Sequence, residues 1–144
     1  MTGHDFLALA IRLAGAGSEA EQRTALSRAY YAAFHVARQL LEDLAFSPPA
    51  DEHAHKYVAW RVSNCGNPLV MRAGSQLDIL RGFRNRADYD LRRSLSSAVV
   101  SQQVRAAEQI VQTLDSLTPA ERVQIMDAMK VYERDVLQEV TWHP

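Results

Sequence analysis

Five arginines lie within a thirteen-residue segment of this chain: Arg81, Arg84, Arg86, Arg92 and Arg93. The formal net charge of the whole chain is only −1, so this segment is a local concentration of positive charge. An arginine guanidinium is a planar fork of donors that matches two oxygens of a phosphate or carboxylate at once. The same segment holds Asn85, Asp88 and Tyr89 at helical spacing. We therefore predict that residues 80–93 contact an anionic partner, namely RNA or a nucleotide.

The predicted binding residues lie along the edge of a helical face. With a step of about 100° per residue, Leu80, Phe83 and Ala87 share one direction. Four polar side chains flank that direction: Arg81, Arg84, Asn85 and Asp88. A side chain at such an edge is held by packing and still reaches into a groove. An alternative stays open, because Arg84 and Asp88 are also spaced for an ordinary surface ion pair, which contributes about 0.3–0.5 kcal/mol.

Length and composition place the chain among globular proteins with one domain, residues 1–144. No stretch approaches the roughly 20 apolar residues of a membrane span, and the N-terminus lacks a basic leader, so we expect a cytoplasmic protein. Cys65 is the only cysteine, which excludes an internal disulfide. His53 and His55 would point to opposite sides of a helix and could not share an ion. We predict no metal and no cofactor.

Hydrophobic residues recur with the helical period, and no run of alternating β-branched residues competes with it, so the fold is predicted to be all-α. The predicted helices cover residues 4–15, 18–46, 52–63, 68–89, 95–117 and 119–140. Short connecting turns favour an antiparallel bundle of five to six helices. The helix 119–140 is an addition at the C-terminal end, on the bundle or against a second subunit. Its apolar stripe is Ile125, Met129, Tyr132, Val136 and Val140.

Two histidines outside the arginine segment are candidate proton-transfer groups. His35 belongs to a polar stripe opposite the predicted core of the helix 18–46, together with Arg28, Tyr31, Arg38 and Glu42. We expect this stripe to be a solvated helix face. The alternative is that His35, or His55 at the start of the next helix, reaches the arginine segment across the bundle or across a dimer.

Three strings of residues, taken in order, resemble the HEPN family. They are Arg28-Ala29-Tyr30-Tyr31-Ala32-Ala33-Phe34-His35, then His55-Lys56 after the proline break, and then Arg84-Asn85-Arg86-Ala87-Asp88-Tyr89. The resemblance covers about residues 7–117. It implies an α-helical bundle that commonly forms a homodimer. It also implies a function among metal-independent RNases, toxin components paired with nucleotidyltransferase antitoxins, and nucleotide-binding modules.

The motif on the helix 68–89 departs from that of the nuclease members. In those members an Arg, usually followed directly by a polar residue, is separated from a His by four to six intervening residues. Arg84 and Asn85 match this start, but Tyr89 stands at the first position where the His would fall, which resembles the Ala-Asp-Tyr branch of the family. Metal-independent RNA cleavage needs a general base, a general acid and cations for the developing charge. Arginines supply only the cations, and a tyrosine with an ordinary pKa of about 10 is a poor base at neutral pH.

Three functional hypotheses follow from the sequence. The first is RNA or nucleotide binding by the four edge residues, in a toxin-like or effector component paired with a nucleotidyltransferase, as the resemblance implies. The second is an active metal-independent endoribonuclease, with Arg84, Asp88 and Tyr89 in the catalytic site and either His35 or His55 transferring protons. The third is a non-catalytic helical dimerisation or interaction module, in which the arginines pair with aspartates inside a dimer interface.

Overall fold

The computed structural model describes all 144 residues and contains six α-helices and no β-strand. The helices are α1 (Gly3–Ala14), α2 (Glu19–Asp43), α3 (Ala54–Val62), α4 (Pro68–Tyr89), α5 (Ser97–Asp115) and α6 (Pro119–Tyr132), followed by one π-helical segment, η1 (Glu133–Leu137). The predicted all-α bundle is confirmed, and α4 has the bounds that the sequence predicts. Helices α2, α3 and α5 are each a few residues shorter than predicted.

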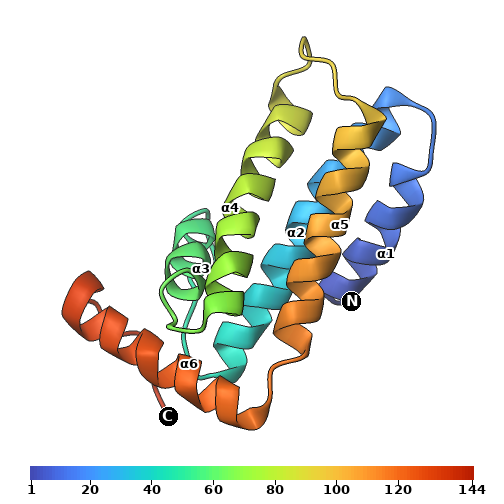
Figure 1. The fold of residues 1–144 in the computed structure, drawn as a ribbon. Coiled ribbons are helices and arrows are strands. Elements are labelled where there is room, and N and C mark those ends of the chain that lie inside the picture. Colours follow the sequence, from blue (N-terminus) through green and yellow to red (C-terminus); the bar gives the residue numbers. More distant parts are fainter.

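Helix α2 is the centre of the bundle, because it packs against α1, α3, α4 and α5. Figure 1 shows α1, α2, α4 and α5 side by side, with α3 next to α4 and α6 across one end. One hydrophobic cluster of 31 buried residues joins these helices and extends from Ala10 to Met129. The central position of α2 brings its side chains within reach of residues from three or more other helices.

Local sequence sets where the helices begin. The Ser18 side chain accepts a hydrogen bond of 3.1 Å from the backbone of Glu21 at the start of α2. The Asn67 side chain accepts from two backbone nitrogens at the start of α4, at 3.0 and 3.3 Å. Each such cap contributes about 1 kcal/mol. Pro68 follows at the first position of α4, where a missing N–H costs nothing. The start of α4 is therefore determined by local sequence.

The end of α3 lies directly on the backbone of α4. A Cβ atom added to Gly74 would lie 2.9 Å from the backbone nitrogen of Ser63, which is closer than such atoms approach one another. Glycine permits this contact because it has no side chain. The close approach holds α3 against α4, and α3 also contacts α2, so His55, in the first turn of α3, lies near the arginine-bearing helix.

The predicted helix 119–140 is too long, because α6 ends eight residues before position 140. Ile125 and Met129 are buried as predicted, whereas Val136 and Val140 are exposed and do not continue the stripe. The chain instead passes through η1 and turns back at Gln138, whose φ of 54° is left-handed.

A buried ion pair accounts for this reversal. Glu133 is fully buried, and its carboxylate accepts a hydrogen bond of 2.8 Å from Arg61 Nε on α3. It also accepts from the backbone nitrogens of Thr141 and Trp142, at 3.0 and 3.2 Å. The Trp142 ring then donates to the Leu44 carbonyl at 2.9 Å. A straight helix would carry residues 141–142 far from Glu133, so these contacts require the turn.

Two further observations concern apolar residues. Leu69, in the first turn of α4, is 66% exposed, and the neighbouring Val70 occupies the core at this turn. None of the helices combines the length and the apolar character that a bilayer-spanning helix needs.

Candidate functional site

The arginine site is built around the ring of Tyr31 on α2. Arg84, on α4, donates from Nη2 to the Tyr31 hydroxyl at 2.7 Å, and its guanidinium carbon lies 5.1 Å from the ring centre. The guanidinium carbon of Arg28 lies 5.4 Å from the same ring centre. Both distances fall within the range of a cation–π contact. Two guanidinium groups from different helices therefore meet at one tyrosine.

The other nitrogens of Arg84 contact residues of its own helix. Its Nε lies 3.1 Å from Asp88 Oδ2, without the alignment of a hydrogen bond, and its Nη1 donates to Asn85 Oδ1 at 2.9 Å. Asp88 in turn accepts from the Ser27 hydroxyl at 3.2 Å. The ion pair that the sequence spacing allows is thus present. The Arg84 side chain is still 16% exposed, so the pair positions the guanidinium without sealing it from solvent.

Arg28 and Arg81 have no carboxylate partner. The only side-chain hydrogen bond of Arg28 is a long one of 3.4 Å, from Nη2 to the Ser27 hydroxyl, and Arg81 makes none. The Nε atoms of both are buried without a hydrogen-bond acceptor. A buried donor without an acceptor costs about 1–3 kcal/mol. These two guanidinium groups would therefore be stabilised by an added anion.

Both candidate histidines lie beside Tyr31 in a single chain. Their ring centres are 6.0 Å (His35) and 6.2 Å (His55) from that of Tyr31. His55 Nδ1 also shares a short hydrogen bond with the hydroxyl of Tyr30, which is buried. We call the following six residues the Tyr31 cluster: Arg28, Tyr31, His35, His55, Arg81 and Arg84.

The surroundings keep both histidines neutral at pH 7. Burial, followed by the charges of Arg38 and Arg28, lowers the pKa of His35 below its ordinary value of 6.5. Burial, followed by the charges of Arg81 and Arg84, lowers the pKa of His55 in the same way. A neutral imidazole can accept a proton. A bound phosphate would offset the arginine charges and raise both pKa values again.

The expectation of a solvated stripe on α2 is wrong for four of its five members. Arg28, Tyr31 and His35 are only partly exposed, because α1 and α4 cover this face. Arg38 is partly exposed too, because its guanidinium donates to the carbonyls of Pro48 and Pro49. Phe6 of α1 stacks on the His35 ring at 5.4 Å, and the guanidinium of Arg28 lies 5.0 Å from the Phe6 centre. The sequence spacing shows that these residues share a face, but a solvated stripe has the same spacing. Arg28 and Tyr31 were therefore missed as site residues.

Tyr89 lies at the open edge of the site. Its side chain is 74% exposed, and the guanidinium carbon of Arg84 lies 5.6 Å from its ring centre. Its exposed ring beside a guanidinium offers a stacking surface rather than a proton-transfer group.

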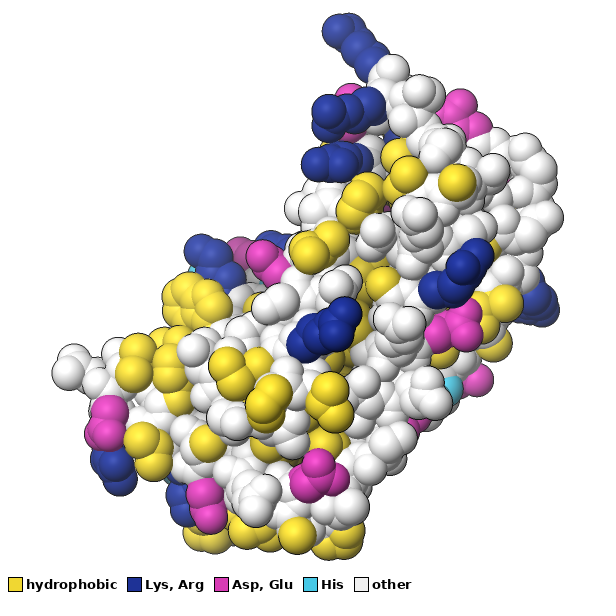
Figure 2. Space-filling view, viewed as in Figure 1, with side chains coloured by type: hydrophobic (Ala, Val, Ile, Leu, Met, Phe, Trp, Pro, Cys, Tyr) yellow, Lys and Arg dark blue, Asp and Glu magenta, His cyan; other side chains and the backbone are white.

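A buried arginine holds the basic segment that follows α4. Arg23, which is 8% exposed, donates from Nη1 to the carbonyls of Arg86, Ala87 and Asp90, at 3.0–3.2 Å, and from Nη2 to that of Arg93. A cation at the C-terminal end of a helix also compensates the helix dipole. Figure 2 shows Lys and Arg side chains gathered at the top of the view, over the end of α4 and the loop that follows it.

Three groups that could hold a metal ion lie close together before α3. The ligand atoms of Asp51, Glu52 and His53 are all within 4.8 Å of one another, and all three residues are exposed. Asp51 Oδ1 lies 3.0 Å from His53 Nδ1. His55 takes no part in this group, because its Nδ1 is bound to Tyr30. An exposed group of this kind is common on protein surfaces, and nothing else marks it as a metal centre.

Comparisons of the chain with protein-family models, with curated proteins and with solved structures found no match. Membership of the HEPN family stays a prediction from the sequence motifs.

Proposed function

We propose that this protein is an HEPN-type module that binds the phosphate groups of RNA or of a nucleotide at the Tyr31 cluster. One observation carries the proposal. Three guanidinium groups, from Arg28, Arg81 and Arg84, converge on this cluster, and only one carboxylate, Asp88, is paired with them. Asp78 also lies near enough to the buried Tyr30 to raise its pKa, so three positive charges stand against two negative ones, and this excess favours an anion. Phosphate oxygens match guanidinium forks in both charge and geometry.

The aromatic rings favour a nucleotide over a simple anion. Tyr89 presents an exposed ring next to Arg84. Proteins that bind single-stranded RNA stack bases on such rings, and each stack contributes about 1–3 kcal/mol. The arginines would then hold the backbone while the ring holds a base.

A fluorescence titration of a short RNA at several salt concentrations tests this proposal. Each phosphate contact that is lost should reduce the slope of log K against log salt by about 0.7. We expect that reduction in Arg84→Ala and in Arg81→Ala. Arg105→Ala is the matched control, because Arg105 is exposed on α5 and has no ion pair. Equal slopes in the wild type and all three variants would remove the phosphate site from α4.

A second candidate function is metal-independent RNA cleavage, and the two histidines favour it. Both are neutral at pH 7, and their ring centres lie 6.0 and 6.2 Å from that of Tyr31, which contacts Arg84. A neutral imidazole could take the proton of a 2′-hydroxyl, whose oxygen then forms a bond to phosphorus. The bond from phosphorus to the 5′-oxygen breaks, and a second group returns a proton to that oxygen. The arginines would stabilise the charge on phosphate.

Incubation of RNA with the purified protein in chelator distinguishes cleavage from binding. Cleavage that is lost in Arg84→Ala, and in either His35→Ala or His55→Ala, would support catalysis. His53→Ala is the control, because His53 is exposed and lies two residues from His55. Intact RNA at protein concentrations that saturate binding would leave the protein a binding module only.

The remaining proposals rest on the resemblance. The protein would form a homodimer and would pair with a nucleotidyltransferase antitoxin. Light scattering would measure the dimer, and co-purification with the product of a neighbouring nucleotidyltransferase gene would test the partner. The Arg84–Asp88 pair also leaves open a purely structural interaction module. In that case Arg84→Ala would weaken the dimer and lower the melting temperature, and no variant would change RNA affinity.

A further inference from the structure

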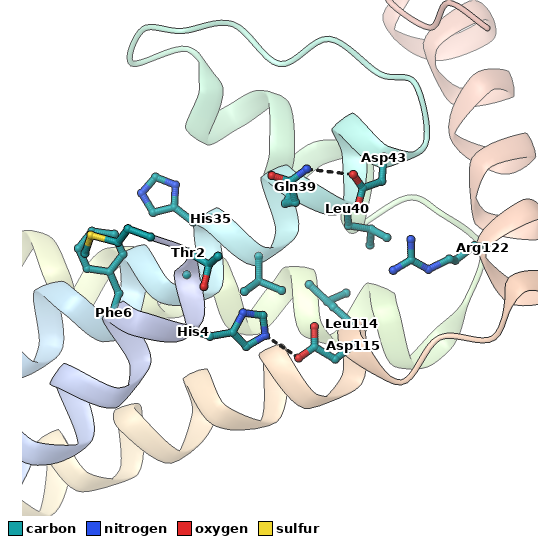
Figure 3. A pocket seen from close by; sticks show the side chains of 13 residues that line it. Thr2, His4, Phe6, His35, Gln39, Leu40, Asp43, Leu114, Asp115 and Arg122 are labelled. Carbon is teal, nitrogen blue, oxygen red and sulfur yellow. Dashed lines mark hydrogen bonds and ion pairs between the residues drawn. The ribbon is translucent and has the colours of Figure 1, made fainter.

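A separate cavity adjoins the Tyr31 cluster. It has a volume of about 610 Å³ and lies between the first turn of α1, the second half of α2, the end of α5 and the start of α6. Figure 3 shows the side chains of these four helices around it. Phe6 and His35 line this cavity. His35 is itself a member of the Tyr31 cluster, and Phe6 contacts the cluster because the guanidinium of Arg28 lies over its ring. A stack of two rings thus forms the boundary between the two compartments.

The cavity has an apolar floor and a rim of hydrogen-bonding groups. Its floor includes the buried side chains of Val36, Leu40 and Leu114. On the rim, Gln39 Nε2 donates to Asp43 Oδ1 at 2.9 Å, which leaves the Gln39 carbonyl oxygen and one N–H free. A flat polar ring could place its faces on this floor and its edge against this rim. A volume of this size is within the range of about 300–1,000 Å³ that small-molecule sites have.

The charges in the cavity favour an uncharged ligand group. Arg122 lines the cavity, and its side chain makes no ion pair and no hydrogen bond. Two carboxylates oppose it, from Asp43 and Asp115, and the second lies 2.7 Å from His4 Nε2. Two carboxylates against one arginine disfavour a phosphate here, whereas a neutral group with donors and acceptors can hydrogen-bond to either kind of side chain. The Tyr31 cluster differs, because its arginines outnumber its single paired carboxylate.

We infer that this cavity receives the base of a nucleotide whose phosphate is held by the Tyr31 cluster. The inference rests on the proposed function and assigns it a second compartment. A nucleotide has an anionic phosphate and a neutral, flat base with donors and acceptors along its edge. The arginines of the Tyr31 cluster match the phosphate, and the apolar floor and hydrogen-bonding rim of the cavity match the base. The rings of Phe6 and His35 lie where the two compartments meet. The cavity therefore contributes selection for nucleotides over other phosphate compounds.

The test compares a short oligoadenylate with an abasic oligonucleotide of the same length, at one salt concentration. We expect the wild type to bind the oligoadenylate about tenfold more tightly. Gln39→Ala and Arg122→Ala should each reduce this preference about threefold and leave affinity for the abasic chain unchanged. Neither residue is buried, so both variants should fold, and thermal melting checks this. Arg12→Ala, exposed on α1, is the matched control.

Further variants distinguish a failure of this inference from a failure of the proposed function. If both cavity variants keep the full preference for bases, the inference is overturned. If Tyr89→Ala alone removes that preference, the base binds at Tyr89 and the inference is likewise overturned. Arg84-dependent binding would still stand in either case, whereas binding that is independent of Arg84 would overturn the proposed function itself. A titration with adenosine monophosphate shows whether the bound base belongs to RNA or to a free nucleotide. If a free nucleotide is the ligand, Gln39→Ala should weaken its binding as well.

Discussion

Tyr31 and Arg84 are 53 residues apart in the chain, and the tyrosine hydroxyl accepts a hydrogen bond of 2.7 Å from Nη2 of the arginine. The contact joins α2 to α4 at the candidate site. A hydroxyl orients one side of the guanidinium without adding a negative charge. Only Asp88 then offsets the charge of Arg84. This is the arrangement expected of an arginine that is held in place and remains available to an anion.

Tyr31→Phe should show how much RNA affinity depends on the orientation of Arg84 when its charge is retained. The variant keeps the ring and removes the hydrogen-bond acceptor, so Arg84 loses the contact to α2 and is oriented only by Asn85 and Asp88 of its own helix. We expect RNA affinity to fall about threefold to tenfold, equivalent to part of the roughly 1.5–3 kcal/mol of a hydrogen bond to a charged group. The salt slope should stay unchanged, because no phosphate contact is removed. Tyr89→Phe is the control, since the Tyr89 hydroxyl makes no hydrogen bond and its ring is retained.

Removal of Glu133 should strongly destabilise the fold. Arg61 and Glu133 are almost completely buried, and the loss of one partner leaves the other charge uncompensated. We expect Glu133→Gln to lower the free energy of unfolding by about 3–5 kcal/mol, measured by urea denaturation. The exposed pair Arg134–Asp135, at 2.8 Å, is the matched control. Asp135→Asn should change stability by no more than about 0.5 kcal/mol. A small loss in Glu133→Gln would show that the C-terminal turn does not depend on the ion pair.

The same carboxylate should make the fold sensitive to acid. Burial acts to raise the pKa of Glu133, but the hydrogen bonds from Thr141 and Arg61, with the Arg61 charge, hold it below its ordinary value of 4.5. The unfolded chain therefore binds this proton more readily than the fold does. Glu133 therefore contributes its full share of the free energy of unfolding above pH 4.5. This contribution is lost as the pH falls through the lower pKa that Glu133 has in the folded state. Urea midpoints measured across this range should fall more steeply in the wild type than in Glu133→Gln.

RNA affinity should rise as the pH falls below neutral. The pKa values of His35 and His55 are lowered from 6.5 in the free protein, and a bound phosphate favours the protonated forms. Binding then takes up protons, and affinity should increase about threefold for each histidine between about pH 7.5 and 5.5. The free protein should lose stability over the same range, because its unfolded chain binds these protons first. A flat pH profile, or equal profiles in wild type and His35→Gln, would contradict the coupling. His53→Gln serves as the control.

Arg23 should stabilise the basic segment after α4. Arg23→Ala removes all the side-chain hydrogen bonds to the backbone between Arg86 and Arg93. We expect a loss of about 1–3 kcal/mol, because the carbonyls of Ala87 and Arg93 lose their donor, whereas those of Arg86 and Asp90 keep a backbone N–H. Amide hydrogen exchange in residues 90–95 should also accelerate. Glu19→Ala removes only the exposed partner of Arg23 and should leave exchange in this loop unchanged. Unaltered exchange in Arg23→Ala would show that the loop is held by other contacts.

Much of the helical framework could be predicted from the sequence, because helix boundaries are local. The caps at Ser18, Asn67 and Thr118, and the prolines beside them, act within a few residues of the ends they define. The bounds of α4 and the edge position of Arg84 follow from them. The end of α6 could not be predicted in this way. It depends on the contact of Glu133 with Arg61, which is 72 residues away.

The sequence by itself determined which residues share a helical face, because the period of the α-helix is constant. It marked the arginines of α4 and named both histidines as alternatives. Only the tertiary structure decided that α1 and α4 cover the polar stripe of α2, so that Arg28, Tyr31 and His35 meet Arg84 and His55. That outcome depends on the packing of the whole core, which sets the angle and rotation of each helix against its neighbours. A stripe exposed to solvent and a stripe beside a binding site have the same spacing, and the neighbouring helices distinguish them.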